Sequence, residues 1–141
     1  MLHPTMPPSM VPSPFCRRVL LVDDDENVRR GLSRVLKRGG FDVDTAEDGG
    51  EALRILQTCA FDVVVSDVNM PVLDGEGLIE LMQDLELDVP LILITGDPDS
   101  VDPLILALQM QVQLLAKPVA PDQLNNAVRA VLTPESTAEL I

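Results

Sequence analysis

The residues best suited to chemistry are acidic, hydroxyl and basic side chains that each follow a short apolar run. Three consecutive aspartates, residues 23–25, follow the first run, and Asp67 follows the third. Thr95 and Lys117 come directly after two later runs. If these positions meet, the carboxylates repel one another, and their pKa values rise unless positive charge lies nearby. The residue types therefore predict a site in which carboxylates are balanced by a dication and by the Lys117 ammonium.

The expected dication is Mg²⁺, because it keeps several waters and binds one or two carboxylates together with phosphate oxygens. A carboxylate can also accept a phosphoryl group and form an aspartyl phosphate. Phosphoryl transfer asks the protein mainly for positioning and for cations near the transferring oxygens. Asp23, Asp24 and Asp67 together with Lys117 would meet both needs. The spacing therefore predicts phosphoacceptor chemistry.

The elements that must position these residues are five short apolar runs separated by helical stretches. The runs cover residues 18–22, 41–46, 62–66, 91–94 and 112–116. Four of them are rich in Val, Leu and Ile, which is typical of strands covered on both faces. The second run alternates apolar and polar residues, which predicts an edge strand with one exposed face.

The stretches between the runs carry apolar residues at helical spacing. Three such stripes are Val28, Leu32, Val35 and Leu36; Leu78, Leu81, Met82 and Leu85; and Leu124, Ala127, Val128 and Val131. The pair Gly39-Gly40 predicts the end of the first helix. This alternation favours an α/β fold, a doubly wound five-stranded parallel sheet with helices on both faces and the flavodoxin-like order 2-1-3-4-5. In that order ligands bind where the strand order reverses, beyond the carboxyl ends of the strands.

Four segments resemble the receiver domain of two-component response regulators, over roughly residues 18–132. They are VLLVDDDENVR, VVVSDVNMPVLDG, LILITG and LLAKP, and they occur in the family's order at the ends of the expected strands. The resemblance implies that Asp67 is the phosphoacceptor and that Mg²⁺ is bound by Asp24, Asp67 and the backbone carbonyl of Asn69. It also implies that Asp23 holds a water bound to the Mg²⁺.

The same resemblance implies roles for the remaining polar positions. Lys117 would pair with the acceptor and later with a phosphoryl oxygen. Thr95 would supply a switch hydroxyl that moves toward the phosphoryl group. Asn69 and Asp97, which flank the site, would influence the lifetime of the phosphoryl group. The peptide bond between Lys117 and Pro118 is expected to be cis.

The resemblance further implies a signal-transduction protein of a phosphorelay and not an enzyme in the usual sense. Its own chemistry would be self-directed phosphotransfer and autodephosphorylation. The partner implied by the resemblance is a histidine kinase or a phosphotransfer protein. The phosphodonor would be a separate protein or another domain, because the only histidine of the chain, His3, lies in the N-terminal stretch and not in the receiver domain.

Two features depart from the family pattern. Leu114 stands where receivers have an aromatic residue, and Met110-Gln111 replaces a pair of small residues. We therefore expect the phosphorylation site to be coupled to the protein surface through movement of the backbone or of the fourth helix. Residues 104–108 are apolar around most of that helix, which predicts a surface that binds a partner. We expect this fourth helix, the strand at residues 112–116 and the fifth helix, which carries the stripe from Leu124 to Val131, to form a homodimer or output-domain interface.

Two alternatives are compatible with part of the pattern. A haloacid-dehalogenase-type phosphatase also has two aspartates at the spacing of Asp23 and Asp25, although Asn27 does not fit and the MPxxDG segment would be unexplained. A pseudo-receiver would act as a protein-interaction module without taking phosphate. Degenerate receivers lose an acid or the acceptor, whereas this chain keeps them and the lysine. Nucleotide binding is disfavoured because neither glycine-rich phosphate motif occurs.

Length and composition set the outer limits. The chain has 141 residues, enough for one domain, and a net charge of −13, which argues against nucleic-acid binding by this domain. No apolar stretch is long enough to cross a membrane. The cysteines predict neither a disulfide nor a zinc site, which favours a cytoplasmic setting, and Cys59 is expected to be a packed core thiol. The predicted organisation is a disordered Pro-rich tail at residues 1–15, a receiver domain at 16–132, and a tail or linker to an output domain at 133–141.

Overall fold

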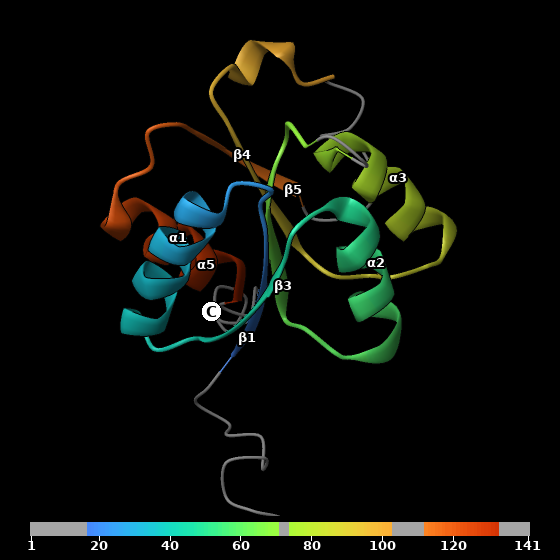
Figure 1. The fold of residues 1–141 in the computed structure, drawn as a ribbon, viewed down its shortest axis with the longest axis horizontal. Coiled ribbons are helices and arrows are strands. Elements are labelled where there is room, and N and C mark those ends of the chain that lie inside the picture. The colour runs from blue at the N-terminus through green and yellow to red at the C-terminus, as the bar shows by residue number, and fades with distance from the viewer. Residues whose placement is uncertain (1–16, 71–73, 103–111, 133–141) are drawn as a thin grey trace, which may run out of the picture.

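The computed structural model describes residues 17–70, 74–102 and 112–132, and its centre is a parallel sheet (Figure 1). The strands are β1 (Arg18–Val22), β2 (Asp42–Ala46), β3 (Val63–Asp67), β4 (Leu91–Thr95) and β5 (Val112–Ala116). All neighbouring pairs are parallel, in the order β2-β1-β3-β4-β5. The predicted α/β fold and strand order are confirmed. The predicted tails and the fourth-helix segment at residues 104–108 lie outside the described residues.

Helices cover both faces of the sheet, as the alternation predicts. They are α1 (Glu26–Arg38), α2 (Gly49–Thr58), α3 (Gly75–Asp84) and α5 (Pro121–Leu132), with a short 3-10 helix η2 (Pro98–Ser100) after β4. Figure 1 shows α1 and α5 on one side of the sheet and α2 and α3 on the other. The turn after α1 uses Gly40, whose φ of 97° lies in the left-handed region that glycine adopts without strain.

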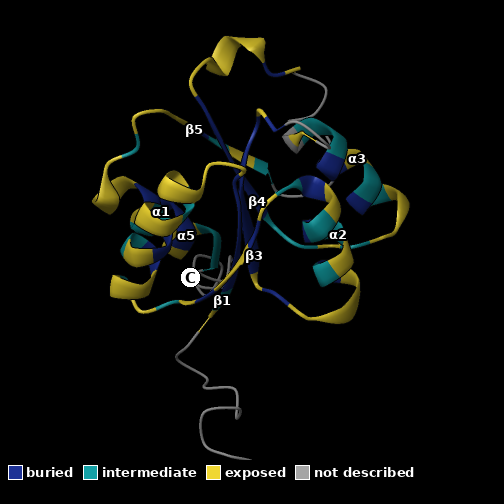
Figure 2. Ribbon diagram, viewed as in Figure 1, coloured by how far each residue is buried: buried dark blue, intermediate teal, exposed yellow. Residues whose placement is uncertain are grey.

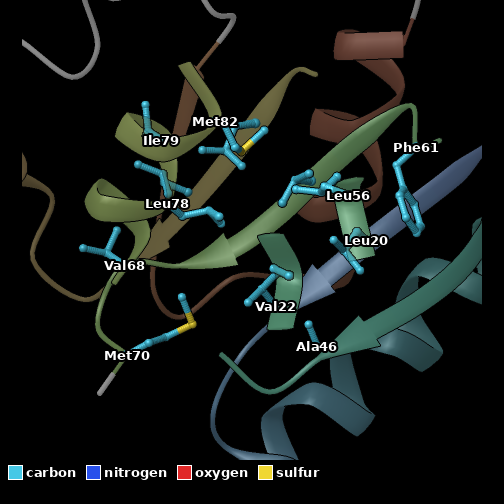
Figure 3. Packing of buried hydrophobic residues seen from close by; sticks show 14 of the residues in the cluster. Leu20, Val22, Ala46, Leu56, Phe61, Val68, Met70, Leu78, Ile79 and Met82 are labelled. Atoms are coloured by element: carbon cyan, nitrogen blue, oxygen red, sulfur yellow. The ribbon is translucent and has the colours of Figure 1, made fainter. Parts of the chain in front are cut away.

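Alternate residues of the central strands supply two separate hydrophobic cores. Leu20 and Val22 of β1 point into the core under α2 and α3, whereas Val19 and Leu21 point into the core under α1 and α5. Figure 3 shows the first core, where Leu20 and Val22 lie among side chains from α2 and α3. Strands β1, β3 and β4 are therefore buried on both faces, and they appear in the buried colour in Figure 2.

The two edge strands are more exposed than the central ones. In β2, Val43 and Ala46 are buried while the residues between and before them are exposed, so the edge position predicted from its alternation is confirmed. The prediction that the run at residues 112–116 is covered on both faces is wrong, because β5 is the other edge. Its Gln113 and Ala116 are exposed and Leu115 alone is buried.

Three apolar residues depart from their predicted burial. Val28 of α1 is 36% exposed, and Leu85 is 43% exposed because it follows the last residue of α3. Cys59 is exposed, so the prediction of a packed core thiol is wrong. It caps the C-terminus of α2 in an extended conformation, where the chain leaves the helix and no longer follows the helical stripe.

Candidate functional site

The carboxyl ends of four adjacent strands bring the predicted polar residues to one rim of the sheet. The register pairs Val22 of β1 with Ser66 of β3, so Asp23 follows β1 beside Asp67 at the end of β3. On the other side of β3, Thr95 ends β4 opposite Ala116, the residue before Lys117. The structure therefore places the candidate residues around the reversal point of the sheet, as the strand order predicts.

The acidic part of the site consists of Asp23, Asp24 and Asp67. One carboxylate oxygen from each of them lies within 4.8 Å of the other two. Asp23 and Asp67 are buried, with 3% and 7% exposure, whereas Asp24 is exposed. A cluster of carboxylate oxygens that is open on one side has the ligand chemistry that Mg²⁺ prefers, with room for waters and phosphate oxygens.

Burial raises the pKa of the Asp23 carboxyl above its usual range. A hydrogen bond from the Asp25 N–H, 2.9 Å from Asp23 Oδ1, acts in the opposite direction. The neighbouring Asp67 and Asp24 raise the pKa further, and Lys117 lowers it. Desolvation and the neighbouring like charges thus disfavour the charged form of Asp23. A bound cation would stabilise that charged form.

The basic part of the site is Lys117. Its Nζ lies 3.3 Å from Asp67 Oδ1, and the same oxygen accepts a 3.4 Å hydrogen bond from the Asn69 N–H. The Lys117–Pro118 peptide bond is cis, as expected. The Lys117 side chain is 40% exposed, so its ammonium can reach both the buried acceptor and a group that arrives from solvent.

Thr95 is fully buried at the end of β4, and it accepts two hydrogen bonds from residues around the site. Its Oγ1 accepts a hydrogen bond of 3.0 Å from the Asp97 N–H, and its carbonyl accepts one of 2.7 Å from the Lys117 N–H. Thr95 therefore connects the loop after β4 to the residue that pairs with Asp67. Asp97 itself is exposed beside the site.

Asp25 and Asp74 have structural roles as helix caps. Asp25 Oδ1 accepts hydrogen bonds from the N–H groups of Asn27 and Val28 at the start of α1, and Asp74 Oδ1 accepts one from Gly77 at the start of α3. This engagement of Asp25 argues against the phosphatase alternative, which needs it as a second reactive acid. The segment at residues 71–73 of the MPxxDG motif lies outside the described residues.

One residue that the sequence analysis did not single out contacts the acidic loop. Arg29 of α1 donates a 2.7 Å hydrogen bond from Nη1 to the backbone carbonyl of Asp23. Its position six residues after Asp23 places it one turn into the helix that the loop enters. Helix α1 contains several arginines, so the sequence alone could not show that Arg29 is the one that contacts the Asp23 carbonyl.

An apolar groove of about 400 Å³ opens beside Lys117, between α1 and the loop after β5. Its lining includes the exposed Val28 together with Leu32, Ile94, Lys117, Pro118 and Val119. The site is thus polar at the acids and apolar at its border.

No helix in the described part of the chain is long and apolar enough to span a membrane.

Comparison with known proteins identifies a family for most of the chain. A family profile described as the response regulator receiver domain matches residues 19–129. The chain is 40% identical over 116 residues to the transcriptional regulatory protein PrrA of Mycobacterium leprae, covering 82% of this chain and 49% of that protein. It is 34% identical over 117 residues to the alkaline phosphatase synthesis transcriptional regulatory protein PhoP of Bacillus subtilis, covering 82% and 48%. The chain spans about half the length of these curated relatives.

Solved structures with the same fold include chemotaxis protein CheY4 of Vibrio cholerae, with 34% identity and a TM-score of 0.74 over 83% of this chain and 99% of that one. A second is the response regulator protein TrrA of Thermotoga maritima in complex with Mg²⁺ and BeF, with 28% identity and a TM-score of 0.71 over 82% and 99%.

Proposed function

This chain belongs to the response regulator receiver family and takes part in phosphorylation-based signalling, and we propose that Asp67 accepts a phosphoryl group from a histidine of a kinase or phosphotransfer protein. The observation that carries this proposal is the Asp67 carboxylate, which is buried, 3.3 Å from Lys117 Nζ and clustered with two further acids. An isolated acid at a strand end would have neither a cation nor companion ligands.

The transfer needs one bond to form and one to break. A carboxylate oxygen of Asp67 attacks the phosphorus, and the bond between the phosphorus and the donor imidazole nitrogen breaks. The nitrogen keeps the electron pair of that bond. With a proton on the other imidazole nitrogen of the donor, the products are an acyl phosphate on Asp67 and a neutral donor histidine. Lys117, already paired with Asp67, is placed to contact a phosphoryl oxygen as negative charge moves there.

The donor set fits Mg²⁺, since three carboxylates lie together and the exposed Asp24 leaves one side open to solvent. Asp24, Asp67 and the backbone carbonyl of Asn69 would hold the ion, with Asp23 acting through a bound water. The ion would supply positive charge to the transferring oxygens. The complex of TrrA with Mg²⁺ and BeF supports Mg²⁺ as the ion by analogy.

The switch would start at Thr95. Its hydroxyl oxygen now accepts a hydrogen bond from the Asp97 N–H. A phosphoryl group on Asp67 would draw the hydroxyl away, because a phosphoryl oxygen would accept a hydrogen bond from it. Movement of Thr95 would displace the loop after β4, while its carbonyl stays bonded to the Lys117 N–H. Leu114 of β5 is half-buried and has no aromatic ring to reorient, so coupling would run through the backbone. The output would be the face of helix 4, β5 and α5.

The test is the intact mass of the protein after incubation with acetyl phosphate and Mg²⁺. We expect the parent to gain one phosphoryl group and Asp67→Asn to gain none. Asp74→Asn is the matched control, because it makes the same change at an acid that caps α3 outside the site. It should be modified like the parent.

Two outcomes would contradict the proposal. Equal modification of the parent and Asp67→Asn would place the acceptor elsewhere. A parent that binds Mg²⁺ but gains no phosphoryl group, either from acetyl phosphate or from a phosphorylated histidine protein, would favour the pseudo-receiver alternative.

A further inference from the structure

We propose that Arg29 is a positioning residue for the Mg²⁺ site: its guanidinium fixes the backbone from which Asp23 and Asp24 project. This inference rests on the proposed function, since it concerns the same acids. The contact that carries it is the 2.7 Å hydrogen bond from Arg29 Nη1 to the Asp23 carbonyl oxygen.

In the loop between β1 and α1, Asp23 makes three hydrogen bonds that bear on the position of Asp24. Its N–H donates to the Ala46 carbonyl of β2 at 3.1 Å, its Oδ1 accepts from the Asp25 N–H at 2.9 Å, and its carbonyl accepts from Arg29. The first two contacts fix the backbone before Asp23 and the direction of its side chain. Of these three contacts, the hydrogen bond from Arg29 is the one made to the peptide group that leads to Asp24.

Asp24 depends on that peptide group. Its side chain is exposed, and no described residue donates a hydrogen bond to its carboxylate. The Asp23 carbonyl and the Asp24 N–H belong to one planar peptide unit. When Arg29 holds the carbonyl, the plane can no longer rotate freely, and the direction in which the Asp24 side chain leaves the backbone is restricted. The ligand is therefore aimed before the metal arrives.

Arg29 differs in this respect from the next residue of the helix. Arg30 also carries a guanidinium, but its side chain is 70% exposed and pairs with Glu26, 3.0 Å away and one turn earlier. Arg29 is half-buried against the loop and donates to a main-chain carbonyl, not to any of the three carboxylates. It leaves every acidic oxygen available for the ion.

Positioning and simple electrostatics predict opposite results. Removal of a positive charge near an acidic cluster should strengthen Mg²⁺ binding, because the ion meets less repulsion. Loss of a positioning contact should weaken it, and outer-shell partners of metal ligands are typically worth about tenfold or more in affinity. In a variant that loses both the charge and the contact, the direction of the change in Mg²⁺ affinity therefore shows which effect is larger.

The experiment compares Arg29→Gln with Arg30→Gln by calorimetric titration with Mg²⁺. The chain has no Trp or Tyr, so intrinsic tryptophan or tyrosine fluorescence offers no signal. We expect Arg29→Gln to bind Mg²⁺ about tenfold more weakly than the parent. Arg30→Gln, with the same loss of charge, should bind as tightly as the parent or slightly more tightly. Arg29→Lys keeps a donor and should recover part of the loss.

A second readout separates positioning from general damage to the fold. At saturating Mg²⁺, phosphorylation of Arg29→Gln by acetyl phosphate should return to the rate of the parent, because the acceptor, Thr95 and Lys117 are unchanged. Thermal unfolding in EDTA identifies variants that are folded at the assay temperature. If Arg29→Gln is not, Arg29→Lys takes its place, and the expected loss in Mg²⁺ affinity is about threefold, the lower end for one hydrogen bond.

The outcomes distinguish this inference from the function on which it rests. Unchanged or tighter Mg²⁺ binding by both Arg29 variants would overturn the role of Arg29 and leave the proposed function intact. Absence of Mg²⁺ binding by the parent would contradict the metal site itself. If the parent takes no phosphoryl group but Arg29→Gln still binds Mg²⁺ more weakly than the parent does, the positioning role of Arg29 would be supported. Only the phosphoacceptor role of Asp67 would then be contradicted.

Discussion

Asp23 is the residue at which the needs of the folded chain and of the proposed site conflict most directly. The carboxyl is almost fully buried, and desolvation together with Asp67 and Asp24 raises its pKa. Because the folded state then binds a proton on Asp23 more tightly than the unfolded state, this group favours folding most at low pH. Its contribution is complete below the ordinary value of 3.8 and is lost as pH rises through the folded pKa.

We therefore expect Asp23→Asn to stabilise the metal-free protein at neutral pH. The gain should be on the order of 1 kcal/mol, the scale of relieving one close pair of like charges in a partly hydrated site. Thermal unfolding in EDTA between about pH 4 and about pH 7 measures it. The stability gap between variant and parent should grow with pH, because an uncharged Asp23 resembles asparagine.

Added Mg²⁺ should reverse the order of the two proteins. The ion stabilises the state that binds it by an amount that depends on its affinity, and Asp23→Asn lacks one of the charges that attract it. The matched control is Asp42→Asn, which removes an exposed carboxylate from β2. A pH-dependent gain of the same size in Asp42→Asn would show that the effect comes from net charge and not from burial of Asp23.

At the scale of elements, the junction of α1 and α5 shows how a contact distant in sequence restricts a glycine. Asn125 of α5 donates from Nδ2 to the Val35 carbonyl at 3.1 Å. A Cβ added to Gly39 would lie 2.6 Å from Asn125 Oδ1. Gly39 has an ordinary right-handed φ of −74°, so its backbone would accept another residue. Packing against α5, and not backbone conformation, requires glycine here.

Substitutions of two glycines, Gly31 within α1 and Gly39 just after it, test this explanation. Gly39→Ala should destabilise the protein by about 1 kcal/mol, since Asn125 must move and its bond to Val35 is lost. Gly31→Ala should stabilise it by about 0.5–1 kcal/mol, because no atom lies within 4 Å of the added Cβ and alanine favours the helix. Urea unfolding measures both. Equal stabilisation by the two variants would mean that the contact with Asn125 does not restrict position 39.

At the scale of the whole molecule, charge and apolar surface are unevenly distributed. No Lys or Arg lies between Arg54 and Lys117, whereas α1 carries a run of cations, so the two faces of the sheet differ in charge. The edge strand β5 leaves Gln113 exposed beside the half-buried Leu114. An edge strand with partial apolar cover is a place where another chain can bind.

We expect the phosphorylated protein to self-associate through the face that contains β5, and Gln113→Arg to weaken that association by placing a charge in the interface. Sedimentation velocity with and without acetyl phosphate and Mg²⁺ would show it. Gln57→Arg, an equivalent change on the exposed side of α2, should behave like the parent. Because the chains carry a net charge of −13, association should strengthen with salt.

Two results would contradict this expectation. A phosphorylated parent that stays monomeric at high concentration would remove the homodimer and leave an output domain as the partner of this face. Equal weakening by Gln57→Arg would show that added charge acts on the molecule as a whole and not at β5.

The sequence alone determined the fold class, the strand order and the positions of Asp23, Asp67, Thr95 and Lys117 at strand ends. It could do so because apolar periodicity reports which residues face a core, and parallel strands place their carboxyl ends on one rim. The alternation in the second strand was sufficient to place it at an edge.

The tertiary structure alone decided which neighbours cover each face. It exposed Cys59 at the end of α2 and left β5 partly uncovered. It also selected Arg29 from a helix of similar residues and brought Asn125 against Gly39. These contacts depend on the distances and angles between packed elements, and a one-dimensional pattern records the direction of a side chain but not the atom that it meets.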